Sequence, residues 1–220
     1  MKYRSVFDII GPVMIGPSSS HTAGAVRIGR LARSLFGMFP KKATIHLYGS
    51  FAKTHRGHAT DVAILAGILG LDTNDTRIPH AFELAKQMGV DFQFIIEEAI
   101  PVHPNTALVV LENGENRICV EGISIGGGMV QITQVDDFEL HLSGDSPALL
   151  IFHQDAYGAI AAVTQLLAKD AVNISHMEVS RSEKGRRALM LIETDQVVSS
   201  DTLDAIAGQA HIQKIIKLDV

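Results

Sequence analysis

Ala148-Leu149-Leu150-Ile151-Phe152 is the stretch that decides the fold of the C-terminal part of the chain. Five apolar residues in a row, followed by polar His153 and Gln154, are typical of a buried β-strand. The signals that follow alternate between helical and strand periods in the order β-α-β-β-α-β, over residues 148–152, 159–167, 174–180, 188–193, 202–207 and 212–218. This order predicts a split, ferredoxin-like unit.

The polar run Ser143-Gly144-Asp145-Ser146-Pro147 separates that unit from the rest and is the predicted domain boundary. We therefore expect one domain over residues 1–143 and a second over residues 148–220. The first opens with a short segment over 3–10. It then shows helical patterns over 25–35, 62–69 and 79–88, and strand patterns over 44–48, 91–97, 106–111, 117–125, 130–135 and 138–142. The fold class is α+β, with an α/β-type N-terminal domain built on a mixed sheet.

Two glycine signals refine this first domain. Asn113-Gly114 between two strand patterns predicts a hairpin turn. Gly126-Gly127-Gly128 leads into a strand pattern with no helix after it, so it predicts a bulge or a close backbone approach and not a nucleotide-binding loop.

Composition limits the function classes. Hydrophobic residues make up 46% of the chain and charged residues 20%, which supports a packed core. The net charge of −5 argues against nucleic acid or an anionic membrane as a partner, and the basic stretch 181–187 is predicted to be a hairpin tip. Cys119 is the single cysteine, so neither a disulfide nor a cysteine metal cluster can form within the chain. With no apolar run long enough to span a membrane and no secretion leader recognised, we expect a cytoplasmic protein.

The most polar segment is Gly16-Pro17-Ser18-Ser19-Ser20-His21-Thr22-Ala23-Gly24, directly ahead of a helical pattern. The first N–H groups of a helix lack intrahelical partners, so hydroxyls and an imidazole there suit a carboxylate or phosphate. In the simpler interpretation one hydroxyl merely caps the helix. Capping uses one or two side chains, and Ser18, Ser19, Ser20, His21 and Thr22 exceed that need. A ligand site is therefore favoured.

A second polar segment, Gly49 to Asp61, is predicted to be the loop between a strand and the next helix. It holds His55 and His58, with Thr60 and Asp61 close behind. Histidines in such a loop are often just solvated, but this density of polar neighbours favours a site. The i, i+3 spacing of His58 and Asp61 at a helix start allows the carboxylate to orient the imidazole.

Gly16-Pro17-Ser18-Ser19-Ser20-His21-Thr22 together with Gly57-His58-Ala59-Thr60-Asp61 resembles the β chain of iron–sulfur L-serine dehydratase, in its two-subunit bacterial form. The C-terminal unit resembles an ACT domain, so the resemblance covers essentially the whole chain. The N-terminal part is then similar to an allosteric-substrate-binding domain. Two positions depart from the family pattern: Ala25 stands where proline is frequent, and His55 stands where glycine is common.

The segment His153-Gln154-Asp155-Ala156-Tyr157-Gly158 resembles the turn by which phosphoglycerate dehydrogenases hold serine. The resemblance implies an effector site with His153, Asp155 and Asn173. Asp155 replaces an asparagine of that family, and a carboxylate there repels the carboxylate of an amino acid. Pairing of two ACT domains, giving a homodimer, is the other role that the resemblance implies.

The dehydratase resemblance implies conversion of L-serine to pyruvate and ammonia. It also implies a 4Fe-4S cluster, held mainly or wholly by an α-chain partner because a cluster needs several thiolates. His21 and His58 are then the catalytic candidates, and this chain supplies no metal ligand. The substrate-binding candidates are Ser18, Ser19, Ser20, Thr22, Thr60 and Asp61. The alternative function is a non-catalytic, amino-acid-sensing regulatory subunit. Three points stay open at this stage: which histidine is the base, whether the site is catalytic or allosteric, and the stoichiometry of the complex.

Overall fold

The computed structural model describes residues 12–219, so the predicted segment 3–10 lies outside the described residues. The chain divides into two compact units, between Asp136 and Asp137. Strand β6 (Phe138–Leu142) therefore groups with the second unit. The domain bounds 1–143 and 148–220 stay a prediction.

The first unit is built on a mixed sheet, as the sequence predicts. Its strands, which run in the order β2-β1-β3-β4-β5, are β1 (Lys42–Leu47), β2 (Asp91–Ile96), β3 (Thr106–Asn113), β4 (Asn116–Gly126) and β5 (Met129–Val135). Strands β1 and β2 are parallel, whereas the pairs β1–β3, β3–β4 and β4–β5 are antiparallel. The strands follow the predicted runs to within two residues, because alternating burial gives a strand a clear period in the sequence.

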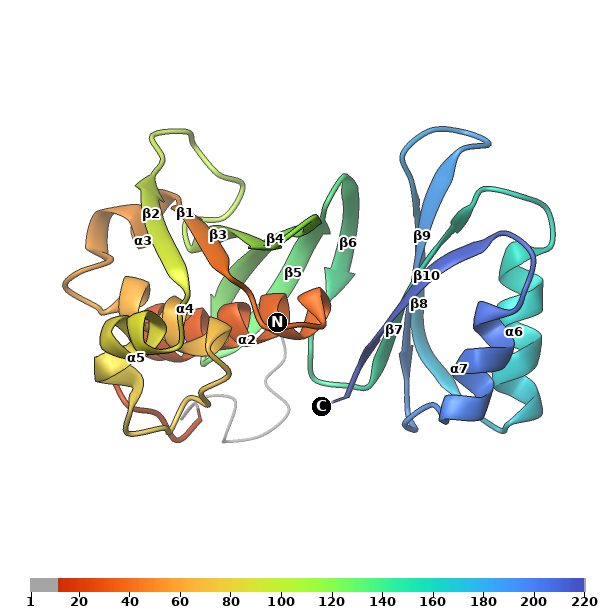
Figure 1. Cartoon of the computed structure of the whole chain (residues 1–220), viewed down its shortest axis with the longest axis horizontal. Helices are drawn as coiled ribbons and strands as arrows, with labels where there is room; N and C mark the ends of the chain where they lie inside the picture. Colours follow the sequence, from red (N-terminus) through yellow and green to blue (C-terminus); the bar gives the residue numbers. More distant parts are fainter. Residues whose placement is uncertain (1–11, 220) are drawn as a thin grey trace. The chain divides into compact units, whose positions relative to one another are not determined.

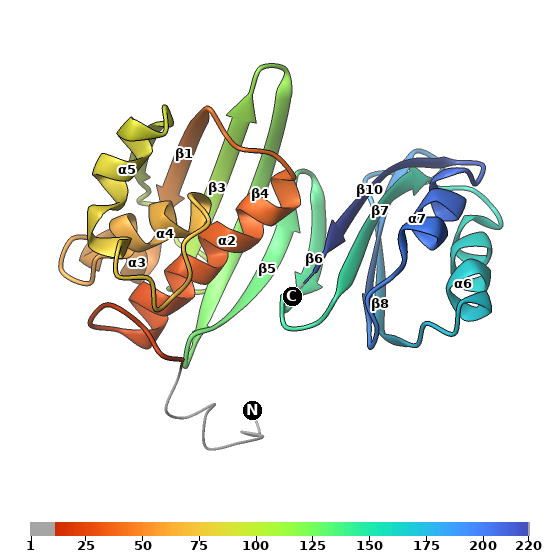
Figure 2. The ribbon, with the colours of Figure 1, turned by 60° about the horizontal axis from the view of Figure 1, so that its bottom comes forward.

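The helices of this unit are η1 (Ser19–Ala23, a π-helix), α2 (Gly24–Phe36), α3 (Gly49–Thr54), α4 (Thr60–Ile68), η2 (Ile78–His80) and α5 (Ala81–Gln87). Figure 2 shows α2 lying along one face of the sheet, with α4 beside it. Gly37, in the left-handed conformation, ends α2 as predicted.

The prediction of a continuous loop over residues 49–61 is wrong at both ends. Residues 49–54 form α3, which is anchored by the buried side chains of Phe51 and Ala52. Thr60 and Asp61 already belong to α4. A helix this short carries too few apolar positions to show a helical period in the sequence.

Helices α2 and α4 meet at two glycines, and this contact has no room for a side chain. A Cβ on Gly29 would lie 2.2 Å from the carbonyl oxygen of Ile64, and one on Gly67 would lie 2.0 Å from the carbonyl oxygen of Val26. The two backbones therefore touch directly. Both helices are almost fully buried along this contact.

The two glycine signals behave as predicted. Residues 113–116 close the β3–β4 hairpin with two residues in the loop. Gly127 and Gly128 both have positive φ and close the β4–β5 hairpin, with a register shift between Ser124 and Gly126. A Cβ on Gly128 would lie 2.6 Å from Cδ of Pro12, so the close backbone approach is also present.

The second unit contains the predicted ferredoxin-like order. After β6 come β7 (Ala148–Gln154), α6 (Ala159–Lys169), β8 (Ile174–Arg181), β9 (Arg187–Thr194), α7 (Ser200–Ala207) and β10 (Ile212–Leu218). The strands run in the order β10-β7-β9-β8, and Figure 1 shows α6 and α7 side by side on one face of this sheet. The β8–β9 turn is the basic stretch 181–187, as predicted.

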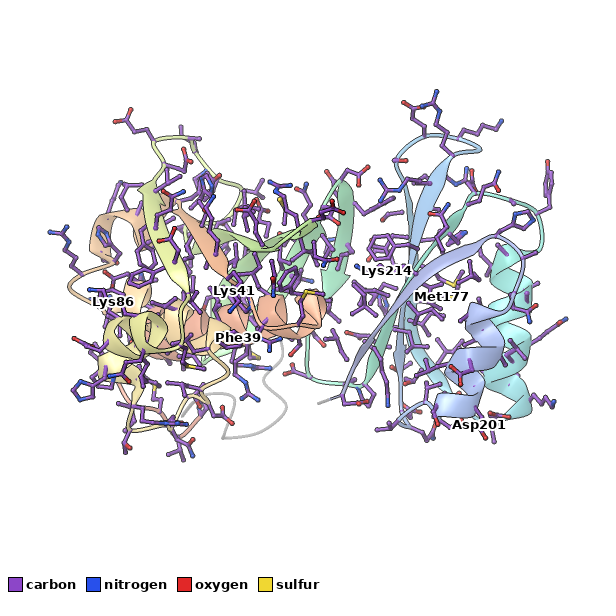
Figure 3. The ribbon with its side chains drawn as sticks, viewed as in Figure 1. Phe39, Lys41, Lys86, Met177, Asp201 and Lys214 are labelled. Atoms are coloured by element: carbon purple, nitrogen blue, oxygen red, sulfur yellow. The ribbon has the colours of Figure 1, made fainter. Side chains whose placement is uncertain are left out.

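The core of this unit lies between the sheet and the two helices. Leu149 and Ile151 of β7, Val163 and Leu167 of α6, and Ile206 of α7 are fully buried there. Met177 of β8, labelled in Figure 3, packs against this cluster from the sheet side. Alternate residues of β7, Leu149 and Ile151, thus face the helices.

Replacing Gly29 by alanine should lower the free energy of unfolding by about 2 kcal/mol, because the new methyl group meets the rigid backbone of α4. Urea denaturation of the full chain measures this change. Gly208→Ala is the control, since φ is −75° there and the nearest atom is 3.5 Å away. Equal midpoints for the two variants would contradict the glycine contact.

Candidate functional site

The serine cluster forms a single turn that opens α2. Ser18 is the N-cap residue, and its Oγ accepts a hydrogen bond from the backbone N–H of His21 at 3.1 Å. The turn is a π-helix, in which the N–H of Gly24 reaches back to the carbonyl oxygen of Ser19. Gly16 packs against it so closely that a Cβ would lie 2.3 Å from Thr22 Cγ2. The capping interpretation is therefore correct for Ser18, but it leaves the other polar side chains to be explained.

His21 is held at both ring nitrogens. Its Nδ1 lies 2.9 Å from Ser20 Oγ, and its Nε2 lies 2.9 Å from Ser50 Oγ at the start of α3. The edge of the ring also meets Phe51, with 5.3 Å between ring centroids. These contacts fix the imidazole from three sides, so His21 joins the serine turn to α3.

His58 lies directly beside His21. The two ring centroids are 4.8 Å apart and the rings are nearly perpendicular, at 89°. The hydroxyl of Thr22 donates to the backbone carbonyl oxygen of His58 at 3.0 Å, which ties the loop before α4 to the serine turn. The imidazole of His58 is exposed, and within residues 12–219 no hydrogen bond engages its ring nitrogens. The structure thus brings the two predicted motifs together.

Burial lowers the pKa of His21 below its usual value of 6.5, and the neighbouring charge on protonated His58 lowers it further. His21 is consequently neutral at neutral pH. A neutral imidazole donates through one nitrogen and accepts through the other, which matches its position between two hydroxyls.

Most of the hydroxyls in the serine turn already form hydrogen bonds with other groups of this chain. Ser18 accepts from the His21 N–H, Ser20 is bonded to His21, and Thr22 is buried and donates to His58. Ser19 is partly exposed, and its hydroxyl makes no hydrogen bond within residues 12–219. The turn therefore offers a ligand fewer free hydroxyls than its sequence suggests.

Thr60 and Asp61 lie behind this surface. Thr60 is 0% exposed, and its hydroxyl has no hydrogen-bond partner in the described part of the chain. Asp61 is 9% exposed and accepts from the N–H of Val62 at 2.8 Å. No hydrogen bond between Asp61 and His58 is present among the described residues, so the expected orienting contact is not formed. His55 instead bonds the carbonyl oxygen of Ala52.

Ser50 is the residue of this site that sequence reasoning missed. Besides bonding His21, it lines a groove of about 820 Å³ that α3 forms with Ile96 at the end of β2 and with Glu97 and Pro104 after it. The sequence did carry one signal for Ser50: it follows a strand pattern and Gly49. Gly49 has a positive φ in the structure, and this turn places the Ser50 hydroxyl at the start of a helix. Its link to His21 joins residues 29 positions apart, which no local pattern shows.

The described residues do not form a metal centre. Within residues 12–219 no three His, Cys, Asp or Glu side chains are grouped so as to hold a metal ion. Cys119 is half-buried, and burial raises the pKa of its thiol. A thiol with a raised pKa is a poor metal ligand, because the thiolate is the binding form. Across the same residues no helix is long and apolar enough to cross a membrane.

The three effector candidates of the second unit do not meet within one copy of the chain. Asp155 is bonded to the N–H of Gly185 at 2.9 Å and pairs with Arg181 at the end of β8. Asn173 precedes β8 and donates to Asp195 at 2.6 Å. An eight-residue strand separates these two ends by roughly 23 Å.

His153, the third of them, is 2% exposed, and its Nε2 has no partner within residues 12–219. Its Nδ1 is bonded to the backbone carbonyl oxygen of Gln154 at 2.8 Å. An effector would reach this ring only if the residues that cover it moved.

Comparison with known proteins assigns both parts of the chain. The family model "Serine dehydratase beta chain" matches residues 5–88, and the model "ACT domain" matches residues 148–211. The chain is 53% identical to the probable L-serine dehydratase β chain of Bacillus subtilis, over 99% of each protein. The chain belongs to the L-serine dehydratase β-chain family. The β chain of Peptoniphilus asaccharolyticus is 35% identical over 93% of each protein.

A more distant relative is the D-3-phosphoglycerate dehydrogenase of Bacillus subtilis. It is 24% identical over 89% of this chain, which spans 37% of that enzyme. The family assignment and the ferredoxin-like second unit agree with the predicted fold class. Both motifs of the L-serine dehydratase β chain, the serine turn and the His58 loop, meet at one place in the first unit.

Replacing His58 by asparagine should raise the pKa of His21 toward 6.5, because both the neighbouring charge and part of the burial are removed. A proton NMR titration of the full chain, following the ring protons of His21, measures this change. His80→Asn, which alters an exposed histidine elsewhere, should leave the titration unchanged. An unaltered His21 pKa in the His58 variant would show that the two rings are not coupled.

Proposed function

We propose that the chain is the β subunit of an L-serine dehydratase, which converts L-serine to pyruvate and ammonia together with an α chain. The observation that carries the proposal is the pair of histidines. One imidazole is fixed between two serine hydroxyls, and a free, exposed imidazole lies 4.8 Å from it. Near-identity of length with the β chains of the family supports the same conclusion.

We assign the role of general base to His58. Dehydration of L-serine requires removal of the Cα proton, and a base needs a nitrogen lone pair that is free to accept it. Both nitrogens of His21 are engaged by Ser20 and Ser50. His58 has no such partner in the described part of the chain and is exposed. His21 is then the neighbour that positions His58 and keeps a neutral surface beside it.

The substrate carboxylate is proposed to bind at the start of the serine turn. The hydroxyl of Ser19 and the backbone N–H groups of Ser19 and Ser20 are donors that the helix itself does not use. Ser18, Ser20 and Thr22 hold the turn rather than contact the substrate, since the hydroxyls of Ser18 and Ser20 are engaged within it and that of Thr22 is bonded to His58. Thr60 and Asp61 support the loop from behind, because both are buried.

A 4Fe-4S cluster does not fit the residues of this chain. Such a cluster is held by several cysteine thiolates, and the sequence contains Cys119 alone. The raised pKa of that thiol argues further against a ligand role. We therefore propose that the α partner binds the cluster and that the isolated β chain is inactive.

The ACT unit is proposed to pair two copies of the chain in the cytoplasm. Its four-stranded sheet ends in β10 on one side and in β8, which contacts β6, on the other, and an unpaired strand edge favours pairing. An effector that contacts both Asp155 and Asn173 would have to lie between two such copies, because one copy holds them at opposite ends of β8. Light scattering of the purified chain should give the mass of a dimer, and a monomer at high concentration would contradict pairing.

The decisive experiment is anaerobic co-expression of this chain with the α chain, followed by an assay of pyruvate formed from L-serine. His58→Asn should lower kcat by about 10²–10⁴-fold, as expected on loss of a general base. His80→Asn is the matched control because His80 is exposed and remote in sequence from both motifs. The chain should stimulate turnover strongly over the α chain alone.

Two other outcomes decide between enzyme and sensor. No stimulation by the β chain would contradict the proposed function. Full kcat in His58→Asn, with a change confined to activation or cooperativity, would instead support the alternative of a non-catalytic amino-acid sensor.

A further inference from the structure

The hydrogen bonds around His21 form one chain of four side chains. Ser18 Oγ lies 3.4 Å from Ser20 Oγ, which lies 2.9 Å from His21 Nδ1. On the opposite side of the ring, Nε2 lies 2.9 Å from Ser50 Oγ. Each serine has one proton to donate, and a neutral imidazole has one as well. Which group donates in each of these hydrogen bonds therefore follows from where the protons can be placed.

The two ends of this series of hydrogen bonds decide its direction. Ser18 Oγ already accepts from the backbone N–H of His21. When Ser18 donates to Ser20 and Ser20 donates to Nδ1, each of these two hydroxyls has both a donor and an acceptor, and the proton left over is that of Ser50. In the reverse direction the proton left over is that of Ser18. Because Ser50 lines the groove beside α3, where water can accept its proton, the first direction is preferred. It places the ring proton of His21 on Nε2, facing Ser50.

We propose that Ser50 is a positioning residue of the dehydratase site. Its hydroxyl oxygen accepts a hydrogen bond from the Nε2–H of His21 and so holds this ring against His58. The expected effect of Ser50 on turnover rests on the proposed function. The hydrogen bond between Ser50 and His21 does not, because both residues are in this chain.

The placement of Ser50 supports this role. It stands at the first turn of α3, next to Gly49, where its backbone N–H bonds the carbonyl oxygen of Pro104 at 2.6 Å. The Thr54 hydroxyl donates to the Ser50 carbonyl oxygen at 2.8 Å. The backbone of Ser50 is thus held on both sides, and its side chain is left for His21. Without that hydroxyl, side-chain hydrogen bonds would hold the ring only at Nδ1, from Ser20 at 2.9 Å and Ser18 at 3.5 Å.

NMR on the full chain without the partner tests the contact. In wild type, the His21 ring proton should be observed on Nε2 at neutral pH, because the hydrogen bond protects it from exchange with water. Ser50→Ala should abolish that signal, whereas Ser50→Thr, which keeps a hydroxyl, should retain it. A ring proton on Nδ1, or an Nε2 signal that persists in Ser50→Ala, would overturn the proposal.

Kinetics of the complex with the α chain test the consequence. Ser50→Ala should lower kcat about tenfold, as expected for loss of one hydrogen bond, with KM changed less than twofold. Ser50→Thr should restore most of kcat, and Ser34→Ala, at an exposed serine of α2, should have no effect. A kcat within twofold of wild type in Ser50→Ala would overturn the positioning role. If the wild-type complex forms no pyruvate, the proposed function fails, while the NMR result still decides the contact.

Discussion

The direct contact of α2 with α4 is the constraint on which the candidate site depends. Gly29 and Gly67 let the two backbones touch, and no larger residue fits at either position. The hydroxyl of Thr22, just ahead of α2, bonds the carbonyl oxygen of His58, just ahead of α4, so the turns before the two helices lie side by side. Packing in the core thus places the serine turn beside the His58 loop.

Hydrogen bonding then determines which of these polar groups remain free. The sequence suggests a cluster of ligand-binding hydroxyls. In the structure, however, the Ser20 hydroxyl is hydrogen-bonded to the ring of His21, and the Thr22 hydroxyl donates to the backbone of His58. What they create is a fixed, neutral His21 with an exposed imidazole next to it. Most polar side chains of the turn hold the ring of His21 in place, and few of their hydroxyls remain free to bind a ligand.

Much of this could be predicted from the sequence, and the failures have definite causes. The alternation of apolar and polar residues predicted the strands and the ferredoxin-like order, and both polar motifs were identified as candidate sites. Helix α3 was missed because Phe51 and Ala52 are its only buried positions. Ser50 was missed because its partner His21 is remote in sequence. The spacing of His58 and Asp61 allows a contact without requiring it, and in the structure the Asp61 carboxylate accepts from the N–H of Val62 instead.

The neutrality of the site bears on how the proposed amino-acid substrate would bind there. The charged neighbour that affects the His21 pKa is His58, and the direct partners of the ring are hydroxyls and an aromatic edge. A carboxylate bound here would meet N–H and O–H dipoles rather than a lysine or arginine of the turn. Dipoles favour a ligand over a short range and in defined directions, so discrimination rests on geometry more than on charge. A site of this kind depends on the rigidity of its scaffold, and here that rigidity begins with the glycine contact between α2 and α4.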